Sequence, residues 1–161
     1  MRRIHIESGP PPRSYDTFEE AVSGAERHPL QDRARCSGSL LEHSKIDAVR
    51  WYTGVCEVSF TNDCMLRVEA REFQLNWEVL ADAPLRTSVA YEPVELVWNP
   101  ELRTVFDPSS LFASISGAEF AKLFVNEWGL LLYTRGNPIL WFQPYRIRDS
   151  RQDFLFGSFD V

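Results

Sequence analysis

The sequence contains few of the residue patterns on which recognisable reaction centres are built. Its three histidines, His5, His28 and His43, show none of the spacings that metal sites use. Its eight glycines form neither a G-x-G-x-x-G nor a G-x-x-x-x-G-K-[ST] motif, and no G-x-S-x-G motif occurs. These absences leave a metal enzyme, a nucleotide-binding loop and a common serine hydrolase without sequence support. We therefore expect no metal and no cofactor.

Cysteine is also scarce, with only Cys36, Cys56 and Cys64 present. An odd number, with no C-x-x-C pair, favours free thiols over a disulfide or a zinc site. Cys56 lies in an apolar row and is expected to be a small buried residue. Cys64 is expected at the tip of a loop, which would make it the most exposed of the three thiols.

Long apolar runs and a positive charge balance are absent as well. No stretch reaches the roughly 18 consecutive apolar residues that a membrane helix needs, and no apolar segment follows Met1-Arg2-Arg3 as a signal peptide would require. The net charge of −6 disfavours a broad phosphate-binding surface. The sequence thus predicts a cytoplasmic protein that binds neither membrane nor nucleic acid.

What the sequence does contain is enough apolar surface for one core. Its 161 residues are 44% apolar, which is the composition and length of an ordinary globular domain. Segment 8–13 departs from this composition because its three prolines favour an extended chain. We predict a single domain over residues 1–161 with 8–13 as a proline-rich connector.

Alternation of apolar and polar residues over 56–60 and 66–70 predicts a hairpin with one wet face. A three-residue loop, 62–64, would pair Phe60 with Leu66 and place apolar residues opposite one another. The apolar phase then changes from even to odd numbers before 73–79. A tight turn at 71–72 or a bulge in one long strand explains the change, and the bulge is preferred because neither residue favours a positive φ.

The rest of the chain predicts an α+β fold with a largely antiparallel sheet of about six to eight strands and two or three short helices. Residues 27–38 are polar and are interpreted as a loop. Ser116 and Glu119 have the spacing of a capping box, so a helix is predicted over 117–126 and is expected to pack on the sheet. The other predicted helices are 17–26 and 108–115, and the other predicted strands are 1–8, 89–98, 102–106, 130–133, 139–142 and 154–159.

The richness in aromatic residues, 13% of the chain, gives two functional readings. The leading one is a non-catalytic binding or protein-interaction domain, because Trp, Tyr and Arg dominate binding surfaces. Its candidate partner-binding residues are Trp128, Tyr133, Tyr145, Arg146 and Arg148.

The alternative is a small-ligand-binding protein or enzyme with a pocket between the sheet and helix 117–126. Its aromatic lining would be Trp77, Trp98 and Trp141. A homo-oligomer that pairs through an edge strand near Pro93 is a third possibility. The carboxylates of Glu57, Glu69 and Glu78 are interpreted as members of cross-strand charge pairs rather than as an acid–base pair.

Overall fold

The computed structural model describes residues 1–8, 27–52, 54–72, 74–84, 91–126, 129–135, 139–148 and 155–159, the last of these by backbone pairing alone. The predicted helix over 17–26, nearly all of the predicted connector and Trp128 lie outside these ranges. The single-domain organisation stays a prediction.

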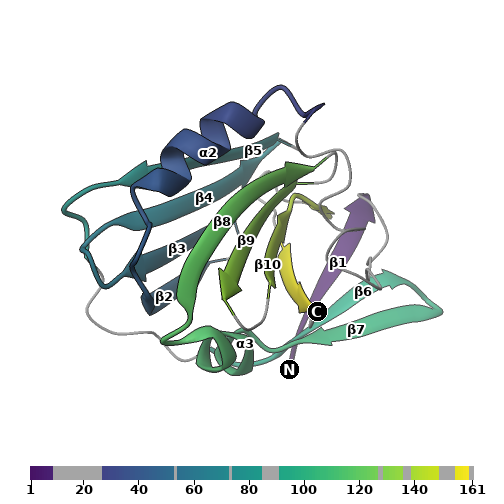
Figure 1. The fold of residues 1–161 in the computed structure, drawn as a ribbon. Helices are drawn as coiled ribbons and strands as arrows, with labels where there is room; N and C mark the ends of the chain where they lie inside the picture. The colour runs from purple at the N-terminus through teal and green to yellow at the C-terminus, as the bar shows by residue number, and fades with distance from the viewer. Residues whose placement is uncertain are drawn as a thin grey trace.

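Three four-stranded sheets dominate the described part of the chain (Figure 1). The strand orders are β2-β3-β4-β5, β12-β10-β9-β8 and β11-β1-β6-β7, and the helices are α2 (Gln31–Ser39) and α3 (Pro108–Ile115). The strands are β1 (Arg2–Ser8), β2 (Ile46–Tyr52), β3 (Val55–Phe60), β4 (Met65–Arg71), β5 (Gln74–Leu80), β6 (Val94–Asn99), β7 (Leu102–Phe106), β8 (Glu119–Asn126), β9 (Gly129–Arg135), β10 (Ile139–Gln143), β11 (Arg146–Ile147) and β12 (Leu155–Phe159).

Within these sheets the described strand pairs are antiparallel, except for the parallel pair β1 and β6. The α+β class with a largely antiparallel sheet is thereby confirmed, with more strands than predicted.

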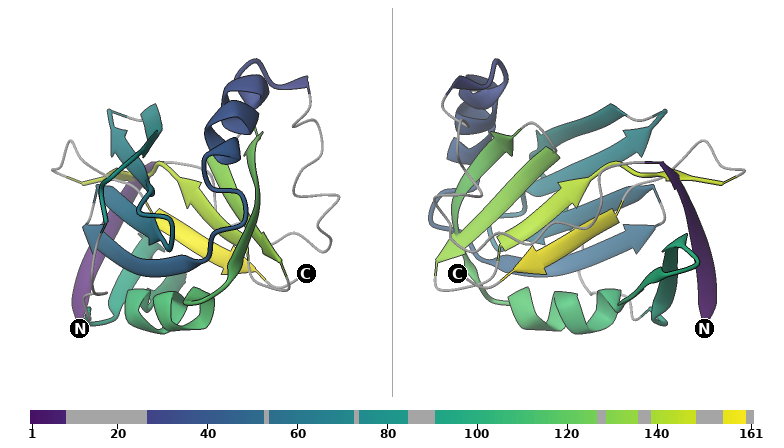
Figure 2. Two further views of the ribbon diagram at one scale, coloured as in Figure 1. Left: turned by 60° about the vertical axis from the view of Figure 1, so that its left-hand side comes forward. Right: turned by 90° about the vertical axis from the view of Figure 1, so that its right-hand side faces the viewer.

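The sheets β2-β3-β4-β5 and β12-β10-β9-β8 face each other across the main core (Figure 2). Cys56, Val58, Leu66 and Val68 point into it from the first sheet, because alternate residues of a strand share a face. Near the start of β8 the two sheets join at one corner, where Lys45 pairs with Glu119 in an isolated bridge. A second, smaller core lies between β1, β6 and Tyr145.

The β3–β4 hairpin corrects the predicted register by two residues. Val58 pairs with Leu66, and the backbone N–H of Phe60 donates to the carbonyl of Cys64 at 2.9 Å. The loop is therefore 61–63, with Asp63 at φ 64°, a conformation that aspartate tolerates. Because the shift is an even number of residues, the predicted core face is preserved. Cys64 lies directly before β4 and accepts this hydrogen bond instead of forming the loop tip, and Cys36 is the exposed thiol.

A turn, not a bulge, separates β4 from β5. Arg71 pairs with Gln74, and Glu72 adopts φ 53° in the turn between them. A left-handed non-glycine residue costs about 1–2 kcal/mol. The strand pairing from Met65–Leu80 to Arg71–Gln74 outweighs that cost. The φ preference of Glu72 alone therefore predicted the wrong connection.

The predicted helix over 117–126 is wrong, because this segment is strand β8. Ser116 is the C-cap of α3 and Gly117 has φ 80°, so the supposed capping box marks the end of one helix rather than the start of another. A bulge between Phe120 and Lys122 interrupts the alternation of β8 and gives its apolar residues a helix-like spacing.

The predicted loop over 27–38 is also wrong, because it contains α2. This helix buries only Gln31, Ala34 and Gly38, so its sequence lacks an apolar stripe. Polar contacts hold it in place. The amide of Gln31 donates to Leu123 O at 3.2 Å and accepts from Val125 N at 2.9 Å, which covers the edge of β8.

Several predicted elements are confirmed. Asp107 caps α3 and accepts a hydrogen bond from Ser110 N, with Pro108 at the first helical turn. Strands β1, β7 and β12 match their predicted segments, and β9 and β10 form the predicted antiparallel pair. Pro93, in contrast, precedes β6, which lies between β1 and β7 and is not an edge strand.

Candidate functional site

The outer face of the β2–β5 sheet carries the charged side chains that alternate with the core residues. On β4, Arg67 forms an ion pair with Glu69 at 3.1 Å, and Arg71 lies 3.5 Å from the same carboxylate. Arg67 is also the register partner of Glu57 on β3 and of Glu78 on β5. Opposite charges thus occupy neighbouring positions across three strands, as cross-strand pairing requires.

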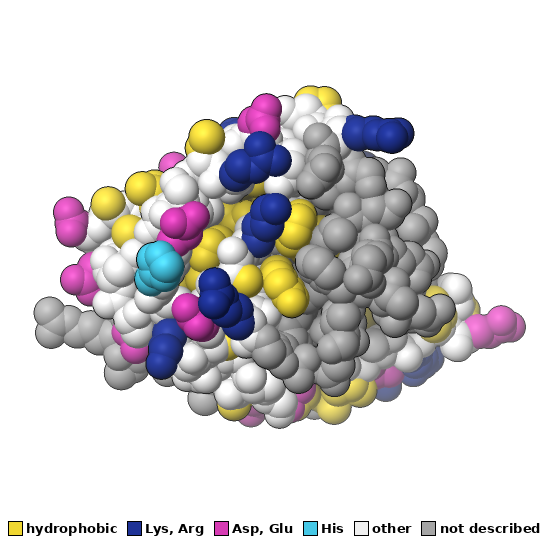
Figure 3. All heavy atoms as spheres, in the orientation of Figure 1, with side chains coloured by type: hydrophobic (Ala, Val, Ile, Leu, Met, Phe, Trp, Pro, Cys, Tyr) yellow, Lys and Arg dark blue, Asp and Glu magenta, His cyan; other side chains and the backbone are white. Residues whose placement is uncertain are grey.

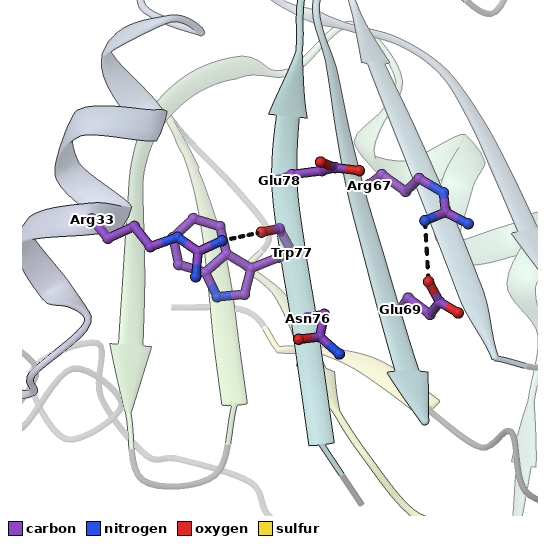
Figure 4. A pocket seen from close by; sticks show the side chains of 6 residues that line it. All are labelled: Arg33, Arg67, Glu69, Asn76, Trp77 and Glu78. Atoms are coloured by element: carbon purple, nitrogen blue, oxygen red, sulfur yellow. Dashed lines mark hydrogen bonds and ion pairs between the residues drawn. The ribbon is translucent and has the colours of Figure 1, made fainter. Parts of the chain in front are cut away.

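A hollow of about 210 Å³ lies on this face beside α2 (Figure 4). The guanidinium of Arg33 lies 4.6 Å from the centre of the Trp77 ring and donates to the backbone carbonyl of Trp77 at 2.9 Å. Figure 4 shows Arg33 and the Trp77 ring on one side of β5, and Arg67 and Glu69 on the other. Arg33 therefore covers the edge of β5 and closes one end of this hollow.

A larger hollow of about 580 Å³ lies at the end of the β2–β3 hairpin, and we call it the Tyr52 hollow. Its lining comes from four segments that are distant in the sequence, and Arg67 forms part of the wall of both hollows. The residues that line it are Arg2, Trp51, Tyr52, Gly54, Val55, Glu57, Arg67 and Tyr91.

Three aromatic rings give the Tyr52 hollow its shape. Tyr52 is 51% exposed and is the one ring of the three that is mostly open to solvent. Tyr91 is fixed in place, since its hydroxyl accepts from Trp51 N at 3.0 Å and its ring packs edge-on against Trp51. Ser109 further anchors the backbone of Tyr91. Burial raises the pKa of the Tyr91 hydroxyl above its ordinary value.

Arg67 and Tyr91 have partners, but three other polar groups of this hollow have none within the described ranges. Among the described residues, the guanidinium of Arg2, the hydroxyl of Tyr52 and the carboxylate of Glu57 make no hydrogen bond or ion pair. The hollow thus offers one unpaired cation, one unpaired anion and a free hydroxyl beside aromatic surface. These groups can together bind a flat polar group.

The three tryptophans of the predicted pocket lie in different surroundings. Trp77 is buried in the main core under Arg33. Trp98 packs edge-on against Tyr145 in the second core, with ring centres 4.8 Å apart. Trp141 is buried on β10 and pairs with Leu131, while its neighbours Leu140 and Phe142 face the main core. The structure does not bring them together around one of the two hollows.

The predicted partner-binding residues are also spread over several elements. Tyr145 is buried, and its hydroxyl donates to Gln143 Oε1 at 2.5 Å. Arg146 and Arg148 are exposed at β11, and Tyr133 is half-buried on β9 beside Lys122. Figure 3 shows Lys and Arg side chains with hydrophobic ones between them over β8, where the ammonium of Lys122 lies 5.1 Å from the Phe124 ring.

Within the described ranges, the structure does not support a metal site, a reactive Cys56 thiolate or a membrane-spanning helix. These ranges hold no group of three or more His, Cys, Asp or Glu side chains that could bind a metal ion. Burial, followed by the charge of Glu57, raises the pKa of the Cys56 thiol well above its ordinary value, which opposes thiolate formation. Neither α2 nor α3 has the length and apolar content to cross a membrane.

No pattern in the sequence indicates the Tyr52 hollow. Tyr52 ends a strand, and Arg2 and Tyr91 are far away in the chain, so no local motif joins them. The only feature of the sequence that relates to it is the presence of polar and aromatic residues near strand ends. Such residues are common at solvated positions, so they do not single out a site. No protein-family model, no curated protein and no solved structure matches this chain.

Proposed function

We propose that this chain is a non-catalytic binding domain that recognises another protein, and that the Tyr52 hollow receives a group from that partner. The observation that carries the proposal is the coincidence of an exposed aromatic ring with unpaired charges in one hollow of about 580 Å³. On the neighbouring strand β4, Arg67 and Arg71 are instead both paired with Glu69.

The chemistry of the lining indicates what the partner group is like. The rings of Trp51, Tyr52 and Tyr91 supply apolar area and a rigid surface for stacking. Arg2 can pair with a carboxylate or carbonyl, and Glu57 can accept from an amide or cation. A flat side chain next to a polar backbone group would use all of these, and a few such residues supply most of the energy of a protein interface.

A small molecule in the same hollow is the second candidate function. The volume falls in the range of about 300–1,000 Å³ that is typical of small-ligand pockets. It favours a ligand of moderate size that combines an aromatic ring with polar groups of both kinds. This candidate places the ligand at the β2–β3 hairpin, away from the three tryptophans that the sequence suggested.

The test is native mass spectrometry of the tagged full chain recovered from its own source cells. The wild type and Leu40→Ala should retain a stoichiometric partner, and Tyr52→Ala and Glu57→Gln should lose it. Leu40 is a matched control, because its side chain is exposed to 52%, as Tyr52 is to 51%, and it lies outside both hollows. A small-mass adduct that Tyr52→Ala removes would select the second candidate. Retention of the partner by Tyr52→Ala would refute the site.

A further inference from the structure

Glu57 is a carboxylate that stands between two arginines and pairs with neither. Its cross-strand neighbours in the register are Arg50 on β2 and Arg67 on β4. Arg67 forms its ion pair with Glu69 instead, at 3.1 Å. Among the described residues, neither Glu57 nor Arg50 takes part in a hydrogen bond or an ion pair. Glu57 lines the Tyr52 hollow and Arg50 does not, so the wall of the hollow presents an anion without an ion-pair partner.

The ring of Tyr52 lies beside this carboxylate. Tyr52 pairs with Val55, and Glu57 is two residues further along β3, so Tyr52 and Glu57 are diagonal neighbours on one face of the hairpin. Such neighbours lie about 7–8 Å apart. This separation leaves space for one flat group that lies against the ring and directs its edge to the carboxylate. Tyr52 is 51% exposed, so its ring is open to such a group.

Resting on the proposed function of this hollow, we infer that the partner protein inserts the guanidinium of an arginine between the Tyr52 ring and the Glu57 carboxylate. A guanidinium is flat and cationic, so its face stacks on an aromatic ring while its edge donates two parallel N–H bonds to one carboxylate. Lysine has the charge without the flat face, and an amide has the flat face without the charge. Arg2, in the same wall, then binds the backbone carbonyl next to the inserted side chain.

The chain itself contains a contact of this kind. The guanidinium of Arg33 lies 4.6 Å from the centre of the Trp77 ring and donates at 2.9 Å to the Trp77 carbonyl (Figure 4). The Tyr52 hollow offers the same two features, a ring and an acceptor, and its acceptor is a full carboxylate rather than a carbonyl. The net charge of −6 also favours the approach of a basic segment.

Arg2 and Arg50 are the two cations that speak for the opposite occupant, an acidic side chain. The exposed ring speaks against it, because the face of an aromatic ring is negative and attracts cations. The variant Arg50→Gln separates the two occupants, since it removes a positive charge next to Glu57 without changing the wall of the hollow. It should tighten the binding of an arginine by about threefold and should weaken the binding of an acidic group.

The test is an NMR titration of the full chain with N-acetyl-arginine N-methylamide, which presents one arginine between two peptide groups. Saturable shifts are expected at the backbone amides of Tyr52, Val55 and Glu57, with a Kd in the millimolar range. The equivalent citrulline and lysine compounds should each bind about tenfold more weakly, because one lacks the charge and the other the flat face. Equal binding of the citrulline compound, stronger binding of the equivalent glutamate compound, or no saturable shift with the arginine compound would overturn the inference.

Glu57→Gln should weaken the binding of the arginine compound by about tenfold. Glu78→Gln is the matched control. Glu78 is the other cross-strand partner of Arg67 and, within the described ranges, also lacks an ion pair, but it lines the smaller hollow and not the Tyr52 hollow. It should change the affinity by less than about twofold. Equal losses in both variants would show a general effect of negative surface charge and would overturn the inference.

Failure of this inference can be told apart from failure of the proposed function. If Tyr52→Ala releases the captured partner but the arginine compound does not bind, the inference fails and the proposed function stands. If the arginine compound binds but no partner protein is recovered, the proposed function fails, and the hollow is a site for a guanidinium group of a small molecule instead.

Discussion

Replacing Gln31 by methionine should lower the stability of the chain far more than the replacement of an exposed glutamine would. Gln31 is the first residue of α2 and is 2% exposed. Its amide satisfies two backbone groups of the β8 edge, the carbonyl of Leu123 and the N–H of Val125. Methionine has a similar length but can replace neither hydrogen bond, so both backbone groups would be buried without a partner.

The magnitude follows from these two groups. A buried backbone donor or acceptor left unpaired costs about 1–3 kcal/mol, and the two together should cost about 2–5 kcal/mol after partial relaxation of α2. α2 buries little apolar surface of its own, so it has few other contacts with which to compensate.

Urea unfolding followed by tryptophan fluorescence measures this loss as a lower midpoint at an unchanged slope. Gln74→Met is the matched control, because Gln74 is an exposed glutamine on β5, and it should change stability by less than about 0.5 kcal/mol. If Gln31→Met lost no more stability than this control, α2 would not be held by the β8 edge, and our account of this helix would be refuted.

Three further predictions use the same reasoning. Gly129→Ala should lower the free energy of unfolding by about 2–4 kcal/mol, because a Cβ at Gly129 would lie 1.9 Å from the backbone oxygen of Phe142. Chemical denaturation measures this loss, and a loss below about 0.5 kcal/mol would contradict the close approach. In the native protein Cys36 should react rapidly with a thiol reagent and Cys56 only upon unfolding, because Cys36 is exposed and burial raises the pKa of Cys56; equal rates would contradict this difference. Hydrogen bonding and charge from Arg3 and Arg103 lower the pKa of Glu95. The contribution of Glu95 to stability should therefore be complete above the ordinary pKa of glutamate, about 4.3, and should be lost as pH falls through the lowered value. Glu95→Gln should abolish this part of the pH dependence of unfolding, and an unchanged profile would contradict the ion pairs.

The sequence predicted the fold class and most strands because the alternation of apolar and polar residues shows which face of a strand is buried. It succeeded for β3 and β4 even though the loop was misplaced by one residue, since the even shift kept Val58 and Leu66 on the core side. It failed at β8, where the bulge after Phe120 broke the alternation and left a pattern that a helix fits equally well.

α2 was missed for the opposite reason. Its residues give little apolar periodicity, because side-chain bonds from Gln31 and Arg33 to strand edges replace the usual apolar stripe. Such long-range bonds leave no pattern in the local sequence. The same limit applies to the Tyr52 hollow, whose members are joined only by the fold.

The binding role of the Tyr52 hollow is tested most directly by hydrogen exchange, measured by mass spectrometry on the full chain with and without its captured partner or ligand. Our account predicts that binding slows exchange most at the end of the β2–β3 hairpin, residues 51–57, and around Tyr91, with little change in α2. Protection concentrated elsewhere, with the hairpin end unchanged, would contradict it.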